Sequence, residues 1–167
     1  QETTLRNTPS LLNAGYQPFQ FWDGRAKTLE HQARMPIVAG DEMNAAPEDL
    51  LKRINAIPEY RKLFSKVFGD DEPISISRIG KAIATFERTI TSGGRSKFDQ
   101  FVAGHTRALS DPAIRGLHLF RTDARCANCH LGPNFTDGKF HEEGLTYYGR
   151  RLQDLGRYNV TKDPADV

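Results

Sequence analysis

The feature that most constrains this chain is a pair of cysteines three residues apart and followed directly by a histidine, Cys126-Ala127-Asn128-Cys129-His130. The chain has 167 residues and only 2 cysteines, and both lie in this segment. The C-x-x-C-H pattern is the attachment signal of c-type haem. Two thiols on one helical turn can add to the two vinyl groups of one porphyrin, and the histidine can ligate the iron. We therefore predict covalent haem at Cys126 and Cys129, with His130 as an axial ligand.

Two other interpretations of the cysteine pair are weaker. A structural zinc site needs four ligands, and beyond the pair the chain offers only scattered histidines. A thioredoxin-like redox motif belongs in a βαβ context, whereas alternating strand patterns are nearly absent here. Covalent haem attachment takes place outside the bacterial cytoplasm, so the same motif also predicts a periplasmic protein.

Composition and charge exclude several classes of partner. The chain has 23 Lys and Arg against 21 Asp and Glu, a formal net charge of +2. This balance argues against a nucleic-acid-binding patch or a polybasic membrane arm. No apolar run approaches the roughly 18 residues of a membrane span. The chain begins at Gln1 without an initiator Met and ends in a polar stretch, so we expect a fragment of a longer protein.

The periodicity of apolar residues predicts a mainly helical fold with long loops. The clearest signal recurs at three- and four-residue steps after Ser75, which can cap the helix: Ile76, Ile79, Ile83, Phe86 and Ile90. Prolines followed by acidic residues predict two helices before it. The expected helices are 28–35 (stopped by Pro36), 47–56, 58–68, 76 to the break at Gly93-Gly94, 97–102, and 110–122 just before the haem motif.

Beyond the haem motif, segments throughout the chain resemble the bacterial dihaem cytochrome c peroxidase family, which includes the MauG-like enzymes. They occur in the family's order and spacing. The most specific is F-W-D-G-R-A at 21–26, with a Gln ten and a Glu twenty residues beyond the Trp. The others are N-T-P-S-L-L-N at 7–13, Pro36, Glu42-Met43, Phe98-Asp99, the 116–120 lead into the haem motif, and G-R-Y-N-V-T at 156–161.

The resemblance implies two class I c-type cytochrome-like haem domains packed together. Residues 1–95 are then the distal part of the N-terminal, peroxidatic haem domain with linking helices. Residues 96–167 are the first part of the C-terminal, electron-transferring haem domain. We expect the first haem's attachment motif upstream of Gln1, and the distal ligand of the haem on His130, usually Met, beyond Val167.

The same resemblance implies roles for three residues in the N-terminal half. Glu42 resembles the distal acid–base that moves a proton between the two oxygens of peroxide. Gln32 resembles the amide that orients peroxide or ordered water, with Pro36 holding the loop between them. Trp22 resembles a relay between the two haems. Without the resemblance, Glu42 and Gln32 would be interpreted as solvated surface residues and Trp22 as a core aromatic.

Other side chains are candidate ligands of a cation or of haem. Asn7 resembles a side-chain ligand of a calcium ion between the haem domains, and calcium favours oxygen donors. Arg25, Arg125 and Arg157 are candidates to pair with haem propionates, because a guanidinium fork suits a carboxylate. Each of the three arginines fits a solvated surface position equally well.

The expected function is the reduction of hydrogen peroxide to water with electrons from a one-electron donor, such as a small cytochrome c, a cupredoxin or a quinol. Two alternatives remain open. One is a MauG-like dihaem oxidase acting on another substrate, and the other is a non-enzymatic monohaem electron-transfer protein. A homodimer is compatible with the resemblance, and no nucleic-acid partner is expected.

Overall fold

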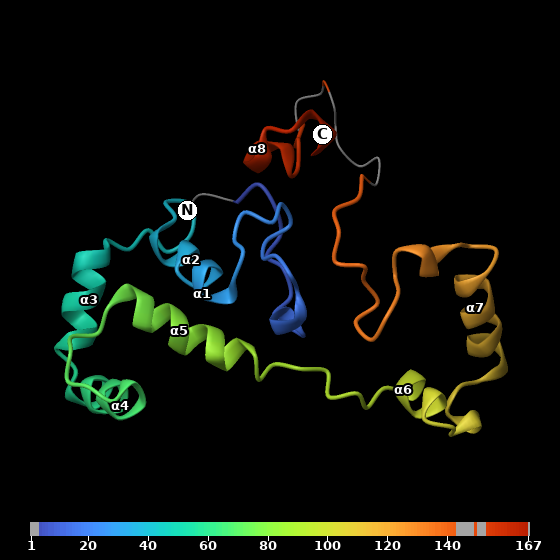
Figure 1. The fold of residues 1–167 in the computed structure, drawn as a ribbon, viewed down its shortest axis with the longest axis horizontal. Coiled ribbons are helices and arrows are strands. Elements are labelled where there is room, and N and C mark those ends of the chain that lie inside the picture. Colours follow the sequence, from blue (N-terminus) through green and yellow to red (C-terminus); the bar gives the residue numbers. More distant parts are fainter. Residues whose placement is uncertain (1–3, 143–148, 150–152, 167) are drawn as a thin grey trace. The chain divides into compact units, whose positions relative to one another are not determined.

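The computed structural model describes residues 4–142, 149 and 153–166. Within that part, the regular elements are α-helices and short 3-10 helices, with one isolated antiparallel bridge between Gln20 and Ala26 (Figure 1). The chain forms two compact units. Unit 1 comprises the described residues of 1–90 and 142–167, and unit 2 comprises residues 91–141. The mainly helical fold expected from the sequence is confirmed.

Unit 1 begins with a long loop that contains the short 3-10 helix η1 (Ala14–Tyr16). Its helices are α1 (Leu29–Gln32), α2 (Met35–Val38), α3 (Pro47–Asn55), α4 (Pro58–Phe68) and α5 (Ile76–Glu87), followed near the C-terminus by α8 (Tyr158–Thr161) and η4 (Pro164–Asp166). Unit 2 contains α6 (Lys97–Val102), η2 (Thr106–Ala108), α7 (Asp111–Arg121) and η3 (Cys126–Asn128).

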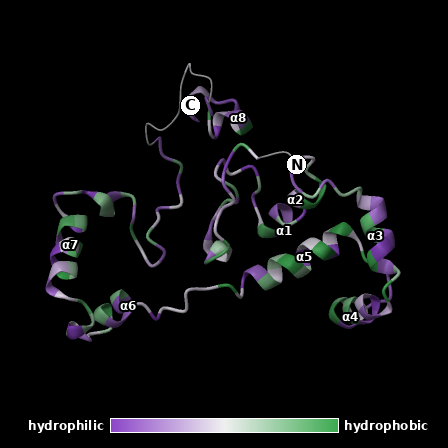
Figure 2. Cartoon of the chain, turned by 180° about the vertical axis from the view of Figure 1, so that it is seen from behind, coloured by the Kyte–Doolittle hydropathy of each residue, from purple (hydrophilic) through white to green (hydrophobic). Residues whose placement is uncertain are grey.

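Helix α5 is the centre of unit 1. Its Ser75 cap accepts a hydrogen bond from the amide of Arg78, as the sequence predicts. Helix α5 carries both polar and apolar residues (Figure 2). Its buried apolar side chains belong to two small clusters. One contains Ala14, Leu29 and Ala84, and the other is built on Ile37, Ile74 and Ile79. Helix α5 thus links η1, α1 and α2 to the α3–α4 pair through apolar contacts.

Helices α1 and α5 pack so closely that one position accepts only glycine. A Cβ atom added to Gly80 would lie 2.8 Å from the carbonyl oxygen of Glu30 and 2.9 Å from Cγ of Arg34. The Arg34 guanidinium donates in turn to that carbonyl, at 3.0 Å. The position of α1 against α5, and of Gln32 at the end of α1, therefore depends on the absence of a side chain at Gly80.

Two of the expected helices differ from the observed ones by more than one residue at an end. Pro36 does not stop a single helix over 28–35, because that segment forms two short helices and Pro36 lies in the first turn of α2, where a missing amide costs nothing. Helix α5 ends at Glu87 rather than at Gly93-Gly94. The chain turns there, and the carbonyl of Ile90 accepts from the amide of Asn13 at 2.9 Å. A long-range contact thus replaces further helix.

Among the described helices, none combines the length and the apolar character that crossing a bilayer requires.

Candidate functional site

The cysteines of unit 2 lie on a single turn that follows α7. Arg125 adopts a left-handed conformation, with φ 55°, and η3 begins directly after it. The amides of Cys129 and His130 both donate to the carbonyl of Cys126, at 3.3 and 2.9 Å. Neither cysteine is in a disulfide bond. The turn therefore presents two thiols and one imidazole from five consecutive residues, as haem attachment requires.

The imidazole of His130 is oriented by a backbone carbonyl. Its Nδ1 lies 3.1 Å from the carbonyl oxygen of Phe135, which can only accept a hydrogen bond. Nδ1 therefore carries the proton, and the lone pair of Nε2 is left for a metal. The Phe135 backbone is itself left-handed, with φ 52°, and the amide of Thr136 bonds to Leu131 at 2.9 Å. The loop after the motif thus holds the imidazole of His130 in one tautomer.

A cavity of about 220 Å³ lies against this imidazole. Its large apolar lining residues are Phe98, Leu117, Phe120, Leu131 and Phe135. An apolar, partly aromatic wall beside an oriented imidazole suits the face of a porphyrin, so the residues present fit haem. Ligand pockets usually measure roughly 300–1,000 Å³. The described residues therefore enclose only part of such a group.

Arg121 also lines this cavity, and sequence reasoning did not single it out. It lies in the last turn of α7, five residues before Cys126. Of the three arginines predicted to pair with propionates, Arg125 is exposed beside the motif. Arg25 and Arg157 belong to unit 1 and contact Asp23 there. The position of Arg121 five residues ahead of Cys126 is the signal that could have identified it.

A second potential ligand group surrounds Cys129. The sulfur of Cys129, the carboxylate of Asp137 and the imidazole of His141 offer ligand atoms within 4.8 Å of one another. Asp137 and His141 are also hydrogen-bonded to each other at 2.9 Å. A thioether bond to haem removes the thiolate that such a site would need. Haem attachment and metal binding at this cluster are therefore mutually exclusive.

In unit 1, the predicted distal residues come from α1 and from the loop after α2. Gln32 ends α1 and is half-buried. Its Oε1 is buried, and within the described part of the chain it has no hydrogen-bond partner. Glu42 is exposed in a loop that folds back onto α2, because the amides of Met43 and Ala45 donate to the carbonyls of Pro36 and Ile37 at 3.1 and 2.9 Å.

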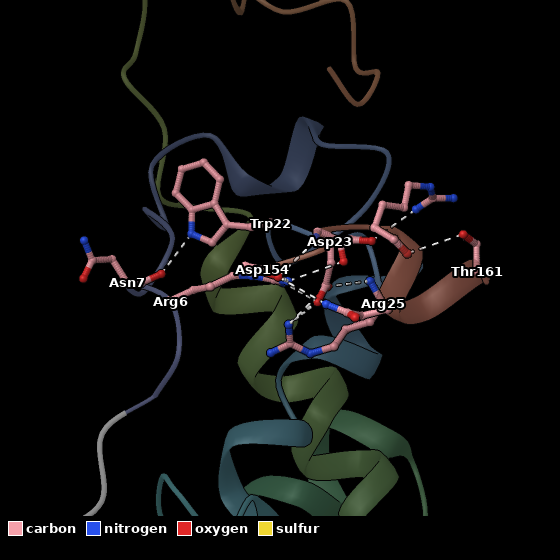
Figure 3. Close-up of polar contacts among 10 residues, drawn as sticks. Arg6, Asn7, Trp22, Asp23, Arg25, Asp154 and Thr161 are labelled. Atoms are coloured by element: carbon pink, nitrogen blue, oxygen red, sulfur yellow. Dashed lines mark hydrogen bonds and ion pairs between the residues drawn. The ribbon is translucent and has the colours of Figure 1, made fainter. Parts of the chain in front are cut away.

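Trp22 is 64% exposed and therefore is not a core residue of the described unit. Its Nε1 donates to the backbone carbonyl of Asn7 at 2.9 Å, as Figure 3 shows. The amide side chain of Asn7 points away from the indole in the same view. Asn7 thus contacts Trp22 through its backbone and leaves its side-chain oxygen, the predicted calcium ligand, directed elsewhere.

Next to Trp22 lies an ion-pair network centred on Arg6. Its Nη1 donates to Asp23 at 2.5 Å, and its Nε and Nη2 donate to Asp154 at 2.5 and 2.6 Å (Figure 3). Burial of Asp23 opposes its ionisation, but hydrogen bonds from Arg6 and from the amide of Arg25 outweigh it and lower the pKa of Asp23. The hydrogen bond from Arg6 also lowers the pKa of Asp154.

The attachment turn, the oriented imidazole and the helical fold define a c-type haem-binding protein. The family model for di-haem cytochrome c peroxidase matches residues 1–107. The chain belongs to the di-haem cytochrome c peroxidase family.

Relatives and solved structures agree with this assignment. The chain is 44% identical to the methylamine utilization protein MauG of Methylorubrum extorquens, over 91% of this chain and 42% of that protein. It is 40% identical to the cytochrome c551 peroxidase of Nitrosomonas europaea, over 96% of this chain and 47% of that protein. The diheme peroxidase BthA of Burkholderia thailandensis matches with a TM-score of 0.69 at 28% identity, over 81% of this chain and 40% of that one. The chain thus spans less than half the length of these relatives.

Proposed function

We propose that this chain is part of a dihaem cytochrome c peroxidase that reduces hydrogen peroxide to water. Each peroxide takes up two electrons and two protons and yields two molecules of water. Family membership supports the proposal, as do the peroxidase relatives of Nitrosomonas europaea and Pseudomonas aeruginosa, which are 40% and 35% identical.

One observation favours an enzyme over a simple electron carrier. The Oε1 atom of Gln32 is buried and lacks a hydrogen-bond partner among the described residues. Buried polar atoms are nearly always hydrogen-bonded, so this oxygen can accept from a group that the described residues do not supply. A bound peroxide or an ordered water would satisfy it, whereas a carrier has no use for it.

The proposal assigns a separate role to each of the predicted site residues. Bound haem supplies an iron that exchanges electrons. In unit 2, Cys126 and Cys129 would hold the porphyrin, and His130 would offer its Nε2 to the iron. In unit 1, Gln32 orients the peroxide and Glu42 carries the proton from one oxygen to the other. Trp22 is the relay between the two haems.

Further parts of the proposal concern the whole protein. We assign residues 1–95 to the peroxidatic haem domain and 96–167 to the electron-transferring one, with a second haem c attached upstream. Calcium binds at Asn7, between the two haem domains. The protein is periplasmic, it takes electrons from a small cytochrome c, a cupredoxin or a quinol, and it can form a homodimer.

A second candidate function is MauG-like oxidation of another substrate, because MauG proteins of two organisms are each 44% identical to this chain. One experiment on the full-length protein separates the candidates. The haem-to-polypeptide ratio is measured by pyridine haemochrome assay, and peroxide consumption is followed with a reduced one-electron donor. We expect two haems per chain and catalytic turnover. One haem per chain would identify an electron carrier, and two haems without donor-dependent turnover would favour the MauG-like oxidase.

A further inference from the structure

Two adjacent contacts join the start of unit 1 to the loop that carries Trp22. Arg6 pairs with Asp23 at 2.5 Å, and the next residue, Asn7, accepts from the indole of Trp22 at 2.9 Å. The two segments therefore lie side by side, with Arg6 in contact with Asp23 and Asn7 in contact with Trp22. A shift of Arg6 would move the carbonyl to which the indole is bonded.

Arg6 is held in turn by a segment from the far end of the chain. The carboxylate of Asp154 accepts hydrogen bonds from both Nε and Nη2 of Arg6. This two-pronged contact is the strongest geometry for a guanidinium and a carboxylate. The amide of Gly156 and the side chain of Asn159 fix Asp154 at 2.9 and 3.2 Å. From the same segment, Arg157 donates to the backbone carbonyl of Asp23 at 3.2 Å.

The Arg6–Asp23 ion pair is largely buried, whereas Trp22, which lies beside it, is exposed. The side chains of Asp23 and Arg6 are 7% and 22% exposed, whereas Trp22 is 64% exposed. Within the described residues, an indole as exposed as that of Trp22 has few packing contacts that select one rotamer. Its orientation here depends on the hydrogen bond to Asn7, and hence on the buried ion pair beside it.

We propose that Arg6 and Asp154 are positioning residues that set the orientation of the Trp22 indole through the paired segments 6–7 and 22–23. The effect on catalysis rests on the proposed function, in which Trp22 relays electrons between the haems. The effect on the indole itself does not.

The test uses the full-length dihaem protein and the nearly isosteric variant Asp154→Asn, which keeps the shape of the side chain and removes its charge. Ultraviolet resonance Raman spectroscopy reports the hydrogen bond of the indole N–H, and the difference spectrum against Trp22→Phe isolates the band of Trp22. We expect Asp154→Asn to shift this band towards a weaker hydrogen bond. We also expect inter-haem electron transfer, followed by rapid reduction kinetics, to slow by about tenfold or more.

Arg78→Gln is the control, because Arg78 also makes a two-pronged contact elsewhere in unit 1, from Nη1 and Nη2 to Asp70 at 2.7 Å for both bonds. It should change neither readout. An unmoved Trp22 band in Asp154→Asn overturns the inference. If Asp154→Asn does not fold, Arg6→Lys is used instead, because lysine keeps the charge but cannot bridge Asp23 and Asp154 together. An unmoved Trp22 band in Arg6→Lys also overturns the inference.

The experiment distinguishes a failure of the relay role of Trp22 from a failure of the positioning role of Arg6 and Asp154. If Trp22→Phe leaves inter-haem transfer unchanged, the relay in the proposed function is wrong, and the Raman shift still decides the positioning role. If Trp22→Phe slows transfer while Asp154→Asn moves neither the band nor the rate, the relay stands and the positioning role is wrong.

Discussion

The Nδ1 atom of His130 lies 3.1 Å from the carbonyl oxygen of Phe135, a residue that packs against Phe98 and Phe120 at ring-centroid distances of 5.3 and 6.3 Å. The aromatic contacts hold the backbone that orients the imidazole. An outer hydrogen bond of this kind raises the basicity of a metal-ligating histidine. The aromatic packing of unit 2 is thereby coupled to the orientation of the His130 imidazole, the predicted haem ligand.

Replacing Phe135 by Ala tests this coupling. Loss of the half-exposed ring should lower the free energy of unfolding by about 1–3 kcal/mol. A loosened carbonyl makes the imidazole less basic, so the ferric state loses stabilisation and the midpoint potential of the haem on His130 should rise. Redox titration and thermal unfolding measure the two effects. Leu119→Ala, on the 50% exposed Leu119 of α7, is the control and should leave the potential in place. An unchanged potential in Phe135→Ala would show that the carbonyl does not depend on the ring.

Glu42→Gln tests the proton transfer to peroxide. The amide is nearly isosteric but cannot carry the proton, so peroxide turnover should fall by about 100-fold or more. The haem absorption spectrum should stay the same, because the substitution leaves Cys126, Cys129 and His130 unchanged. Glu48→Gln makes the same change at an exposed acid in the first turn of α3 and should retain turnover. Turnover within a few-fold of wild type in Glu42→Gln would exclude this carboxylate as the proton carrier.

Gly80→Ala tests whether the place of α1 matters for the distal site. Alanine favours a helix by about 1 kcal/mol over glycine, yet the new methyl group would overlap the carbonyl of Glu30. We expect a net loss of stability of about 1–3 kcal/mol, and slower peroxide turnover because Gln32 is displaced. Gly116→Ala in α7, where an added Cβ meets nothing within 4 Å, should instead stabilise the protein. Denaturant unfolding and steady-state kinetics provide the comparison, and equal stability changes in the two variants would refute the close packing.

Glu87→Gln tests the cost of a buried carboxyl group. Glu87 is 5% exposed and its Oε2 has no hydrogen-bond partner among the described residues. Burial raises its pKa above the ordinary value of 4.5, and the nearby Glu30 adds to this effect against the opposing charge of Arg88. The unfolded chain therefore releases this proton first, so stability falls as the pH rises from 4.5 through the raised pKa.

The expected outcome is that Glu87→Gln unfolds at higher denaturant concentration than wild type at pH 7, with the difference shrinking at pH 4. Unfolding curves at the two pH values measure this. Glu59→Gln, at an exposed acid of α4, should show no such pH-dependent gain. A gain for Glu87→Gln that is the same at both pH values would contradict ionisation as its cause.

Features that depend on neighbours in sequence were predictable. The attachment turn at Cys126–His130 follows from five consecutive residues, and α4 and α6 have the expected bounds because proline, serine and glycine act within one turn of a helix. The Ser75 cap is of the same kind. The division of a predicted single helix at Pro36, and the early end of α5 at Glu87, were not predictable in this way, because contacts from other segments compete with local helix propensity.

By itself, the sequence determined that this chain is helical, that it carries a c-type haem attachment turn, and that its motifs have the order of the dihaem peroxidases. Only the tertiary structure decided which groups meet: the carbonyl of Phe135 and His130, Arg121 and the cavity, and Asp154 and Arg6 across 148 residues of sequence. It also decided that Oε1 of Gln32 is buried without a partner among the described residues. The physical reason is that covalent attachment and helix formation use groups a few residues apart. Burial and ion pairing use groups that chain folding brings together, and no local pattern encodes their partners.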